Sequence, residues 1–190
     1  MARLPTEIVV IGASAGGIDA LSTIFSSLPQ DISVPILVAI HLHPGRDSQL
    51  VDLFLTRHSR PIKEAEDRER AQPGTIYFAP PDYHLLVDPG GILSLSADEK
   101  VNFARPSIDV LFESAAYAYG PNALGIILTG ANHDGSEGLK IIKDRGGLTG
   151  VQDPKTAEVS VMPLAAIQKT VIDCIDSLQG ISEFIMKSLK

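Results

Sequence analysis

Three segments of this sequence each place a residue of catalytic type directly after a predicted buried strand. Ser14 lies in the turn GASAGG after the apolar run 7–12, His41 follows the apolar run 34–40, and Asp134 lies in GANHDG after the apolar run 123–129. A serine hydroxyl hardly ionises at neutral pH, so attack on a carbonyl needs a base, and a carboxylate orients that base. The three residue types together predict a serine hydrolase site.

Each residue also has a structural explanation that the pattern alone leaves open. Residues 12–16 match G-x-S-x-G, in which small neighbours expose a nucleophilic hydroxyl at a sharp turn and helix amides stabilise an oxyanion. Ser14 would serve equally well as the cap of the helix that follows. Asp134 begins Asp-Gly-Ser-Glu, which resembles a capping box. His41 could be a histidine whose ring is satisfied by backbone groups at a strand end. His43, His84 and His133 also compete with His41 for the role of base, and spacing does not separate them.

The glycine-rich turn after the first strand also suggests a dinucleotide site, which needs further residues. An acidic side chain is expected at the end of the second strand, but the sequence there is Ala-Ile-His-Leu-His, and no Tyr-x-x-x-Lys pair is present. We therefore predict no cofactor. Metal ligands could come from the side chains of His41, His43, Asp47, Asp52, His133 and Asp134. Without His-Glu-x-x-His or paired cysteines, we predict no metal.

Composition narrows the class of protein further. The 190 residues fit a single domain over 1–190, and the net charge of −7 argues against a nucleic-acid partner. No run of about 18 apolar residues predicts membrane insertion, and the N-terminus has no signal-peptide pattern. The single cysteine, Cys174, excludes an internal disulfide, fits a cytoplasmic location and is expected to be a small buried residue.

The order of the elements predicts an α/β fold with a mostly parallel, doubly wound sheet and helices on both faces. Strands are expected at 7–12, 34–40, 123–129 and 148–152, and helices at 17–27, 46–58, 107–119 and 135–145, from Pro163, and at the C-terminus. Ser107 is the expected cap of its helix. Short strands at 75–79, 83–87 and 91–95, separated by PPD and DPGG turns, predict antiparallel hairpins added at one edge of the sheet.

With these residues in place, the chain resembles the catalytic domain of the chemotaxis protein-glutamate methylesterases, the CheB type. The resemblance covers about residues 7 to 170. Its segments follow the family's order: IVVIGASAGGIDAL, VAIHLHPG, PGTIYFAPPDYHLLV, RPSIDVLFESAA, GIILTGANHDGSEGLKIIKDRGG and VQDPKTAEVSVMPLAAI. Together these segments are far more specific than G-x-S-x-G alone.

The resemblance implies a catalytic triad of Ser14, His41 and Asp134, which selects His41 among the histidines. It also implies hydrolysis of glutamate γ-methyl esters on chemoreceptor-like proteins to glutamate and methanol, with glutamine deamidation in some members. The family segment usually reads T-G-M-G-x-D-G, whereas this chain has Ala131 and Asn132 in place of the methionine and the second glycine. The receiver domain that precedes the catalytic segments in many relatives is missing from this sequence. The expected explanations are a constitutive stand-alone esterase, a piece of a longer chain, or regulation by a separate protein. A separate receiver domain or a methyltransferase is an expected partner in the last case.

The sequence leaves two other classes of function as hypotheses. The changes at Ala131 and Asn132 motivate a catalytically weak binding module of a signalling pathway, which would bind its partner without releasing methanol. Nucleotide binding at the glycine turn is the third hypothesis and predicts affinity for NAD(P) or ATP.

Overall fold

The computed structural model describes residues 4–41 and 50–190, and a seven-stranded parallel sheet forms its centre. The strand order is β3-β4-β2-β1-β7-β8-β9. The strands span Ile8–Ala13 (β1), Ile36–Ile40 (β2), Ile62–Glu64 (β3), Ile76–Phe78 (β4), Ala123–Ile127 (β7), Leu148–Gln152 (β8) and Cys174–Asp176 (β9). Every pairing in this sheet is parallel.

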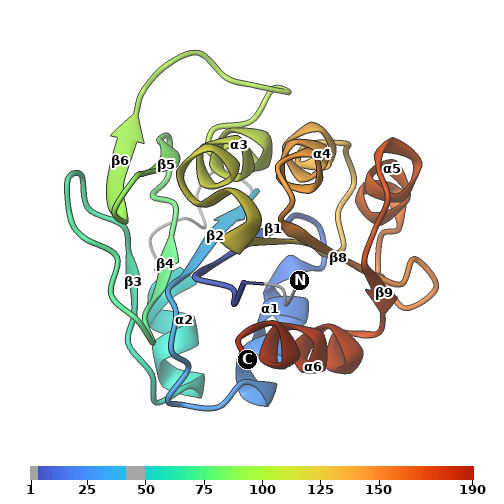
Figure 1. The fold of residues 1–190 in the computed structure, drawn as a ribbon, viewed down its shortest axis with the longest axis horizontal. Coiled ribbons are helices and arrows are strands. Elements are labelled where there is room, and N and C mark those ends of the chain that lie inside the picture. Colours follow the sequence, from blue (N-terminus) through green and yellow to red (C-terminus); the bar gives the residue numbers. More distant parts are fainter. Residues whose placement is uncertain (1–3, 42–49) are drawn as a thin grey trace.

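Helices cover both faces of the sheet, as Figure 1 shows. The helices span Gly17–Ser27 (α1), Leu50–Arg57 (α2), Ile108–Tyr119 (α3), Ser136–Asp144 (α4), Val161–Lys169 (α5) and Leu178–Ser188 (α6). Buried side chains of α1, α2 and α6 join one hydrophobic cluster, and those of α3, α4 and α5 join the other. The predicted doubly wound α/β fold is therefore confirmed, although residues 46–49 of the predicted second helix lie outside the described residues.

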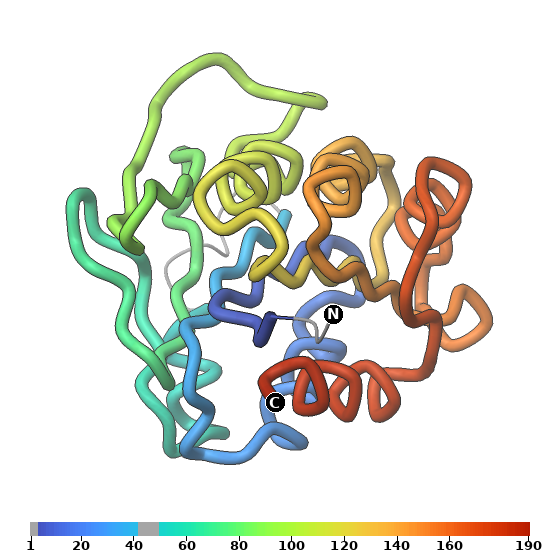
Figure 2. Tube along the Cα trace, viewed as in Figure 1, coloured from blue at the N-terminus to red at the C-terminus, as the bar shows by residue number. Residues whose placement is uncertain are grey.

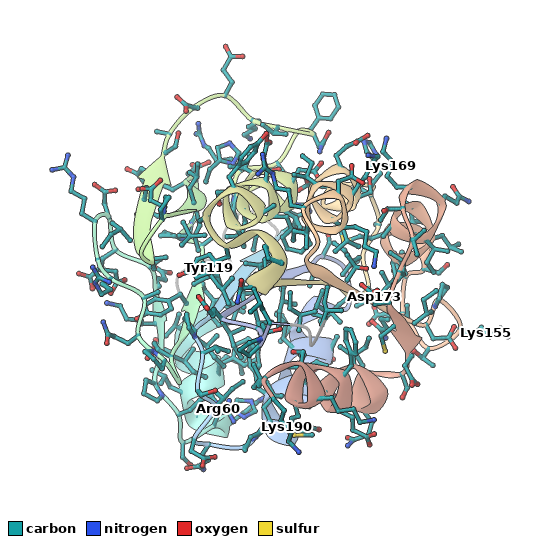
Figure 3. The ribbon with its side chains drawn as sticks, in the orientation of Figure 1. Arg60, Tyr119, Lys155, Lys169, Asp173 and Lys190 are labelled. Carbon is teal, nitrogen blue, oxygen red and sulfur yellow. The ribbon has the colours of Figure 1, made fainter. Side chains whose placement is uncertain are left out.

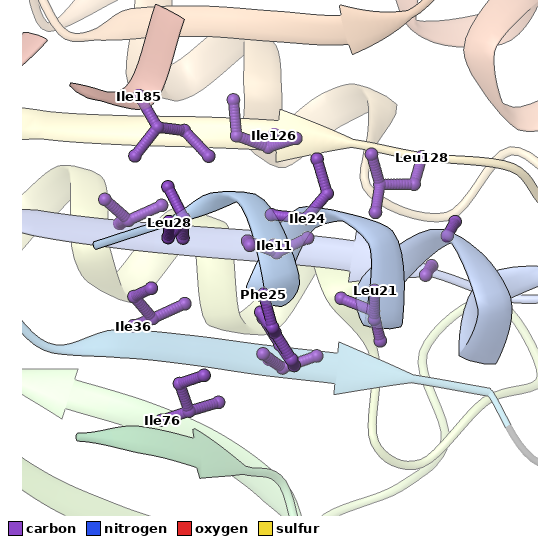
Figure 4. Close-up of a cluster of buried hydrophobic side chains, with 14 of the residues drawn as sticks. Ile11, Leu21, Ile24, Phe25, Leu28, Ile36, Ile76, Ile126, Leu128 and Ile185 are labelled. Carbon is purple, nitrogen blue, oxygen red and sulfur yellow. The ribbon is translucent and has the colours of Figure 1, made fainter. Parts of the chain in front are cut away.

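The central strands are apolar along their whole length because both of their faces are covered. Every residue of β1, β2 and β7 is buried. Figure 4 shows one side of this core, where Ile11, Ile36 and Ile126 meet Leu21 and Ile24 of α1. Continuous apolar strands of this kind are typical of a parallel sheet between two helical layers.

The middle of the chain differs in part from the prediction. The strands β5 (His84–Asp88) and β6 (Ile92–Ser96) form the expected antiparallel hairpin, but as a separate two-stranded sheet. The predicted strand at 75–79 is not part of a hairpin: as β4 it pairs in parallel with β2 and with β3, which was not predicted. All three residues of β4 are buried, so the strand has the two-sided burial of the main sheet.

The chain reverses its direction of travel across the sheet next to β1. From β1 it proceeds to β2 and β4 on one side, and it returns to place β7 and β8 on the other side, as the tube in Figure 2 shows. Ligand sites of open α/β sheets form at such a switch point, beyond the carboxyl ends of the strands. The ends of β2, β1 and β7 therefore define the crevice in which to look for a site.

Two side chains outside the crevice depart from simple expectations. Cys174 begins the edge strand β9 and is half-buried rather than buried, because an edge strand has only one neighbour. Arg60 is 5% exposed, and its guanidinium donates to the carbonyl oxygens of Leu28 (2.6 Å) and Pro29 (3.2 Å) just after α1 (Figure 3). In the described part of the chain, no helix is long and apolar enough to cross a membrane.

Candidate active site

Ser14 lies in the tight turn that joins β1 to α1. Its backbone N–H donates to the carbonyl oxygen of Thr129 (3.0 Å), and its own carbonyl oxygen accepts from Gly17 N–H (2.8 Å), which begins the helix. Gly16 has a φ of 75°, in the left-handed region that glycine adopts without strain. The sequence folds locally in this way because the residues around Ser14 are small, and the turn holds Ser14 at the start of α1.

A second glycine allows the neighbouring strand end to approach Ser14. A Cβ atom added at Gly130 would lie 3.0 Å from the Cβ of Ser14 and 2.6 Å from the Cε of Met162. These distances are too short for ordinary van der Waals contact, so a side chain at position 130 would displace one of its neighbours. The glycine after β7 therefore sets how closely the segment that leads to Asp134 passes Ser14.

His41 follows β2, next to the turn that holds Ser14. Its backbone N–H donates to the carbonyl oxygen of Ala13 (3.1 Å), which continues the pairing of β2 with β1. Its imidazole Nε2 lies 2.8 Å from Oδ2 of Asp134, and 14% of its side chain is exposed. The order of the strands thus brings two of the predicted residues into direct contact and places Ser14 beside them.

Asp134 is completely buried and accepts five hydrogen bonds. The donors are His41 Nε2 (2.8 Å), Asn102 Nδ2 (3.0 Å), Ser107 Oγ (2.8 Å), Ile108 N–H (2.7 Å) and Asp109 N–H (3.1 Å). Burial alone would raise the pKa of the carboxyl group, but the hydrogen bonds from His41, Asn102 and the two backbone amides outweigh it and lower the pKa to about 2. Asp134 is therefore ionised at neutral pH.

The backbone donors show that Asp134 also has a structural role, although not the one that its local sequence suggests. Ile108 and Asp109 are the first residues of α3, so the carboxylate binds the N-terminal amides of that helix rather than capping α4. Ser107 is the residue before α3, as predicted, but its hydroxyl makes no cap hydrogen bond and donates to Asp134 instead.

Two neighbours fix which nitrogen of the neutral His41 ring carries the proton. The ionised carboxylate of Asp134 only accepts, so Nε2 must donate to it. On the other side, Asn132 Oδ1 accepts from the backbone N–H of Asp134 (3.2 Å), which turns the Nδ2 amide of Asn132 toward His41 Nδ1 (3.2 Å). An amide NH₂ group only donates, so Nδ1 holds the lone pair. Nδ1 is therefore the basic nitrogen of this site.

A pocket of about 640 Å³ opens over these residues. Ser14, His41 and Asn132 line it together with Phe78 and Phe103, among other apolar and polar side chains. Its volume lies in the range of small-molecule and substrate sites. Asp134 lies behind His41, out of contact with solvent. A substrate in the pocket would meet the hydroxyl and the imidazole but not the carboxylate.

Two backbone amides beside Ser14 are available to a substrate. Within the described part of the chain, the N–H groups of Ala15 and Gly16 have no hydrogen-bond acceptor. They precede the first residue of α1, whose dipole favours negative charge at this end. Donors in this position suit the oxyanion that forms when a hydroxyl attacks a carbonyl group.

The other histidines that competed for the role of base have different surroundings. His84 is 2% exposed, accepts at Nδ1 from Ser107 N–H (3.1 Å) and bonds through Nε2 to the carbonyl oxygen of Glu99 (3.0 Å). His133 is exposed next to Asp134, and His43 lies outside the described residues. Within residues 4–41 and 50–190, no three His, Cys, Asp or Glu side chains converge as metal ligands.

Sequence reasoning missed three polar side chains at this site. Asn102 bridges the carboxylates of Asp134 and Asp109, Ser107 binds Asp134, and Asn132 binds His41. Asn132 was visible as a departure from the family segment, and Ser107 was visible as a predicted helix cap. Asn102 carried no signal, because it lies in a loop 32 residues before Asp134.

Comparison with known proteins gives matches to one family. A family model described as CheB methylesterase matches residues 9–185. A Leptospira interrogans protein named putative protein-glutamate methylesterase/protein-glutamine glutaminase is 46% identical, over 95% of this chain and 94% of its own length. An Archaeoglobus fulgidus protein of the same name, without "putative", is 40% identical, over 96% of this chain and 53% of its own.

A solved structure shares the fold. The crystal structure of the Thermotoga maritima CheB methylesterase catalytic domain matches with a TM-score of 0.91 and 33% sequence identity, over 97% of this chain and 99% of that one. The chain thus spans nearly all of the Leptospira protein and about half of the Archaeoglobus protein.

Proposed function

Because the chain belongs to the CheB methylesterase family, we propose that Ser14, His41 and Asp134 form a serine esterase site that hydrolyses glutamyl γ-methyl esters. The hydrogen bond between His41 Nε2 and the buried, ionised Asp134 carries this proposal. This hydrogen bond leaves the lone pair of the His41 ring on the other nitrogen, Nδ1, which can act as the base. His41 also lines the same pocket as Ser14.

The proposed reaction has two halves. The Ser14 hydroxyl attacks the ester carbonyl carbon while Nδ1 of His41 takes the hydroxyl proton, and the Ala15 and Gly16 amides bind the oxyanion. Nδ1–H then gives the proton to the departing methoxide, which leaves as methanol. Water attacks the acyl-enzyme with the same base and releases the glutamate carboxylate and the free hydroxyl.

Asp134 acts on His41 rather than on the substrate. When Nδ1 gains the proton, the imidazolium is stabilised by the carboxylate at Nε2. Because Asp134 is held by four further donors, it stays in place as the charge of the ring changes. The roles match those of the Ser-His-Asp template, but the two ring nitrogens are exchanged relative to it.

We propose a methylated chemoreceptor-like protein as the substrate, with a separate receiver domain or a methyltransferase as further partners and the cytoplasm as the location. The names of the relatives include protein-glutamine glutaminase. The same attack on a glutamine side chain would release ammonia in place of methanol, so deamidation is part of the proposal.

A fluorophosphonate probe tests the proposed nucleophile directly. The purified protein is treated with the probe and the modified residue is mapped by mass spectrometry, in the wild type and in Ser14→Ala and His41→Ala. His133→Ala is the matched control, since that histidine is exposed and adjacent to Asp134 but is not the ring bound to it. We expect labelling at Ser14 that is lost in His41→Ala and retained in His133→Ala.

Methanol release tests the substrate. A methylated receptor fragment is incubated with the wild-type protein and with Ser14→Ala, and methanol is measured over time. Release by the wild type alone supports the proposal. Equal release by both proteins, or labelling of a residue other than Ser14, would contradict it.

A further inference from the structure

The side chain of Asn132 binds the nitrogen of His41 that the proposed reaction needs. Its Nδ2 lies 3.2 Å from His41 Nδ1, and its Oδ1 is anchored by the backbone N–H of Asp134. The two contacts hold the amide in one orientation across the face of the site. Asn132 stands where the family segment usually has a glycine, which has no side chain to make either contact.

The neutral imidazole has one lone pair in its plane, at Nδ1, and two groups compete to donate a hydrogen bond to it. The Asn132 amide occupies it in this structure. The Ser14 hydroxyl must donate to the same lone pair before its proton can be transferred. Within the described part of the chain, the Ser14 hydroxyl makes no hydrogen bond, to His41 or to any other group.

We propose that Asn132 is a positioning residue that restrains the enzyme: it keeps Nδ1 of His41 occupied in the resting state and must give way to Ser14 before attack. This inference rests on the proposed function of the same site. Asn132 holds the ring so that Nε2 faces Asp134, but it does so at the expense of the bond between Ser14 and His41. A chain without this amide would form that bond more often.

The size of the effect follows from the exchange of one hydrogen bond for another. The net free energy that one hydrogen bond contributes in a protein corresponds to about a two- to tenfold change in the ratio of two states. Removing the Asn132 amide should therefore raise the rate at which Ser14 reacts by about that factor. Asn132 also lines the pocket, so the limiting rate of labelling, rather than the affinity of the probe, is the quantity that reports on the base.

Two substitutions separate this role from a purely structural one. Asn132→Ala removes the donor to His41 and the acceptor for Asp134 N–H. Asn132→Asp keeps an acceptor of the same shape for Asp134 N–H, but it replaces the donor with a carboxylate. That carboxylate would face His41 from the side opposite Asp134 and hold a proton on Nδ1, which removes the base.

The two variants should therefore change the reactivity of Ser14 in opposite directions. We expect Asn132→Ala to react two- to tenfold faster than the wild type, and Asn132→Asp to react several-fold more slowly. If Asn132 only supports the loop, Asn132→Ala should be slower and Asn132→Asp should resemble the wild type. Circular dichroism and thermal unfolding of each variant establish that the fold is retained.

The measurement is the rate of fluorophosphonate labelling at Ser14 as a function of probe concentration at neutral pH. We expect the limiting rate, reached at saturating probe, to rise in Asn132→Ala. A wild-type protein labelled at Ser14, with Asn132→Ala equal or slower, would overturn this inference alone. A folded wild-type protein with no labelling at Ser14 would overturn the proposed function and this inference with it.

Discussion

Acidification offers a direct test of the charge on Asp134. Its pKa in the folded protein is about 2, below the ordinary value of 3.8. A carboxyl group whose pKa is lowered by folding stabilises the protein above its unfolded-state pKa, and that contribution is lost as the pH falls through the folded-state value. At about 1.4 kcal/mol per pH unit, the difference corresponds to roughly 2.5 kcal/mol in the free energy of unfolding.

About 1 kcal/mol of this contribution should be lost between pH 5 and pH 3, below the range in which histidines ordinarily titrate. Urea unfolding followed by circular dichroism gives the free energy at each pH, since the chain has no tryptophan for fluorescence. The variant Asp134→Asn has no ionisable group at this position, so its stability does not include this contribution. The wild type should therefore lose about 1 kcal/mol more than this variant over the interval.

The neighbouring carboxyl group gives a control of opposite sign. Burial and the charge of Asp134 raise the pKa of Asp109, so protonation of Asp109 favours the folded state as the pH falls. Asp109→Asn removes that opposing effect, so this variant should lose more stability than the wild type on acidification. Parallel losses in the wild type and Asp134→Asn would refute an ionised Asp134, as would a midpoint near 3.8 in an NMR titration of its carboxyl carbon.

Two further substitutions test how the site is held. Gly130→Ala places a Cβ 2.6 Å from Met162 Cε and 3.0 Å from Ser14 Cβ. We therefore expect the free energy of unfolding in urea to fall by about 1–3 kcal/mol and the fluorophosphonate labelling of Ser14 to become slower. Labelling at the wild-type rate would contradict the close packing. Asn102→Ala removes a hydrogen bond from the amide to each of two buried carboxylates, 3.0 Å long to Asp134 and 2.8 Å long to Asp109. The free energy of unfolding should therefore fall by about 2–4 kcal/mol. A fall of less than about 0.5 kcal/mol would show that this bridge contributes little to stability.

The sequence predicted those parts of the fold whose signal is local. The apolar runs of β1, β2 and β7 are followed by glycine-rich or turn-forming segments, and the rule that sites form beyond the ends of parallel strands placed Ser14, His41 and Asp134 together. The short strands were harder. Three residues such as those of β3 or β4 carry too little periodicity to show which neighbour they pair with, so the parallel pairing of β4 was missed.

The polar network around Asp134 was beyond local reasoning for a different reason. Its donors lie 25 to 32 residues away in the chain, apart from His41 at 93 residues, so no short sequence segment contains both partners of any of these hydrogen bonds. The same distance explains why the local pattern points to the wrong helix for capping. The sequence Asp-Gly-Ser-Glu suggests a cap for the helix that follows, whereas the carboxylate binds the amides of α3, which precedes it in the chain.

Asp134 serves both the fold and the proposed active site, which links the stability of this protein to its activity. The same carboxylate holds the start of α3 and orients His41, so any change that removes its charge acts on both the fold and the base. Ser14 and Asn132 differ in this respect, because neither side chain is part of the buried core. Substitutions at those two positions should change reactivity while the fold is retained. Activity measurements on Ser14 and Asn132 variants therefore report on chemistry, and those on Asp134 variants must be interpreted together with unfolding data.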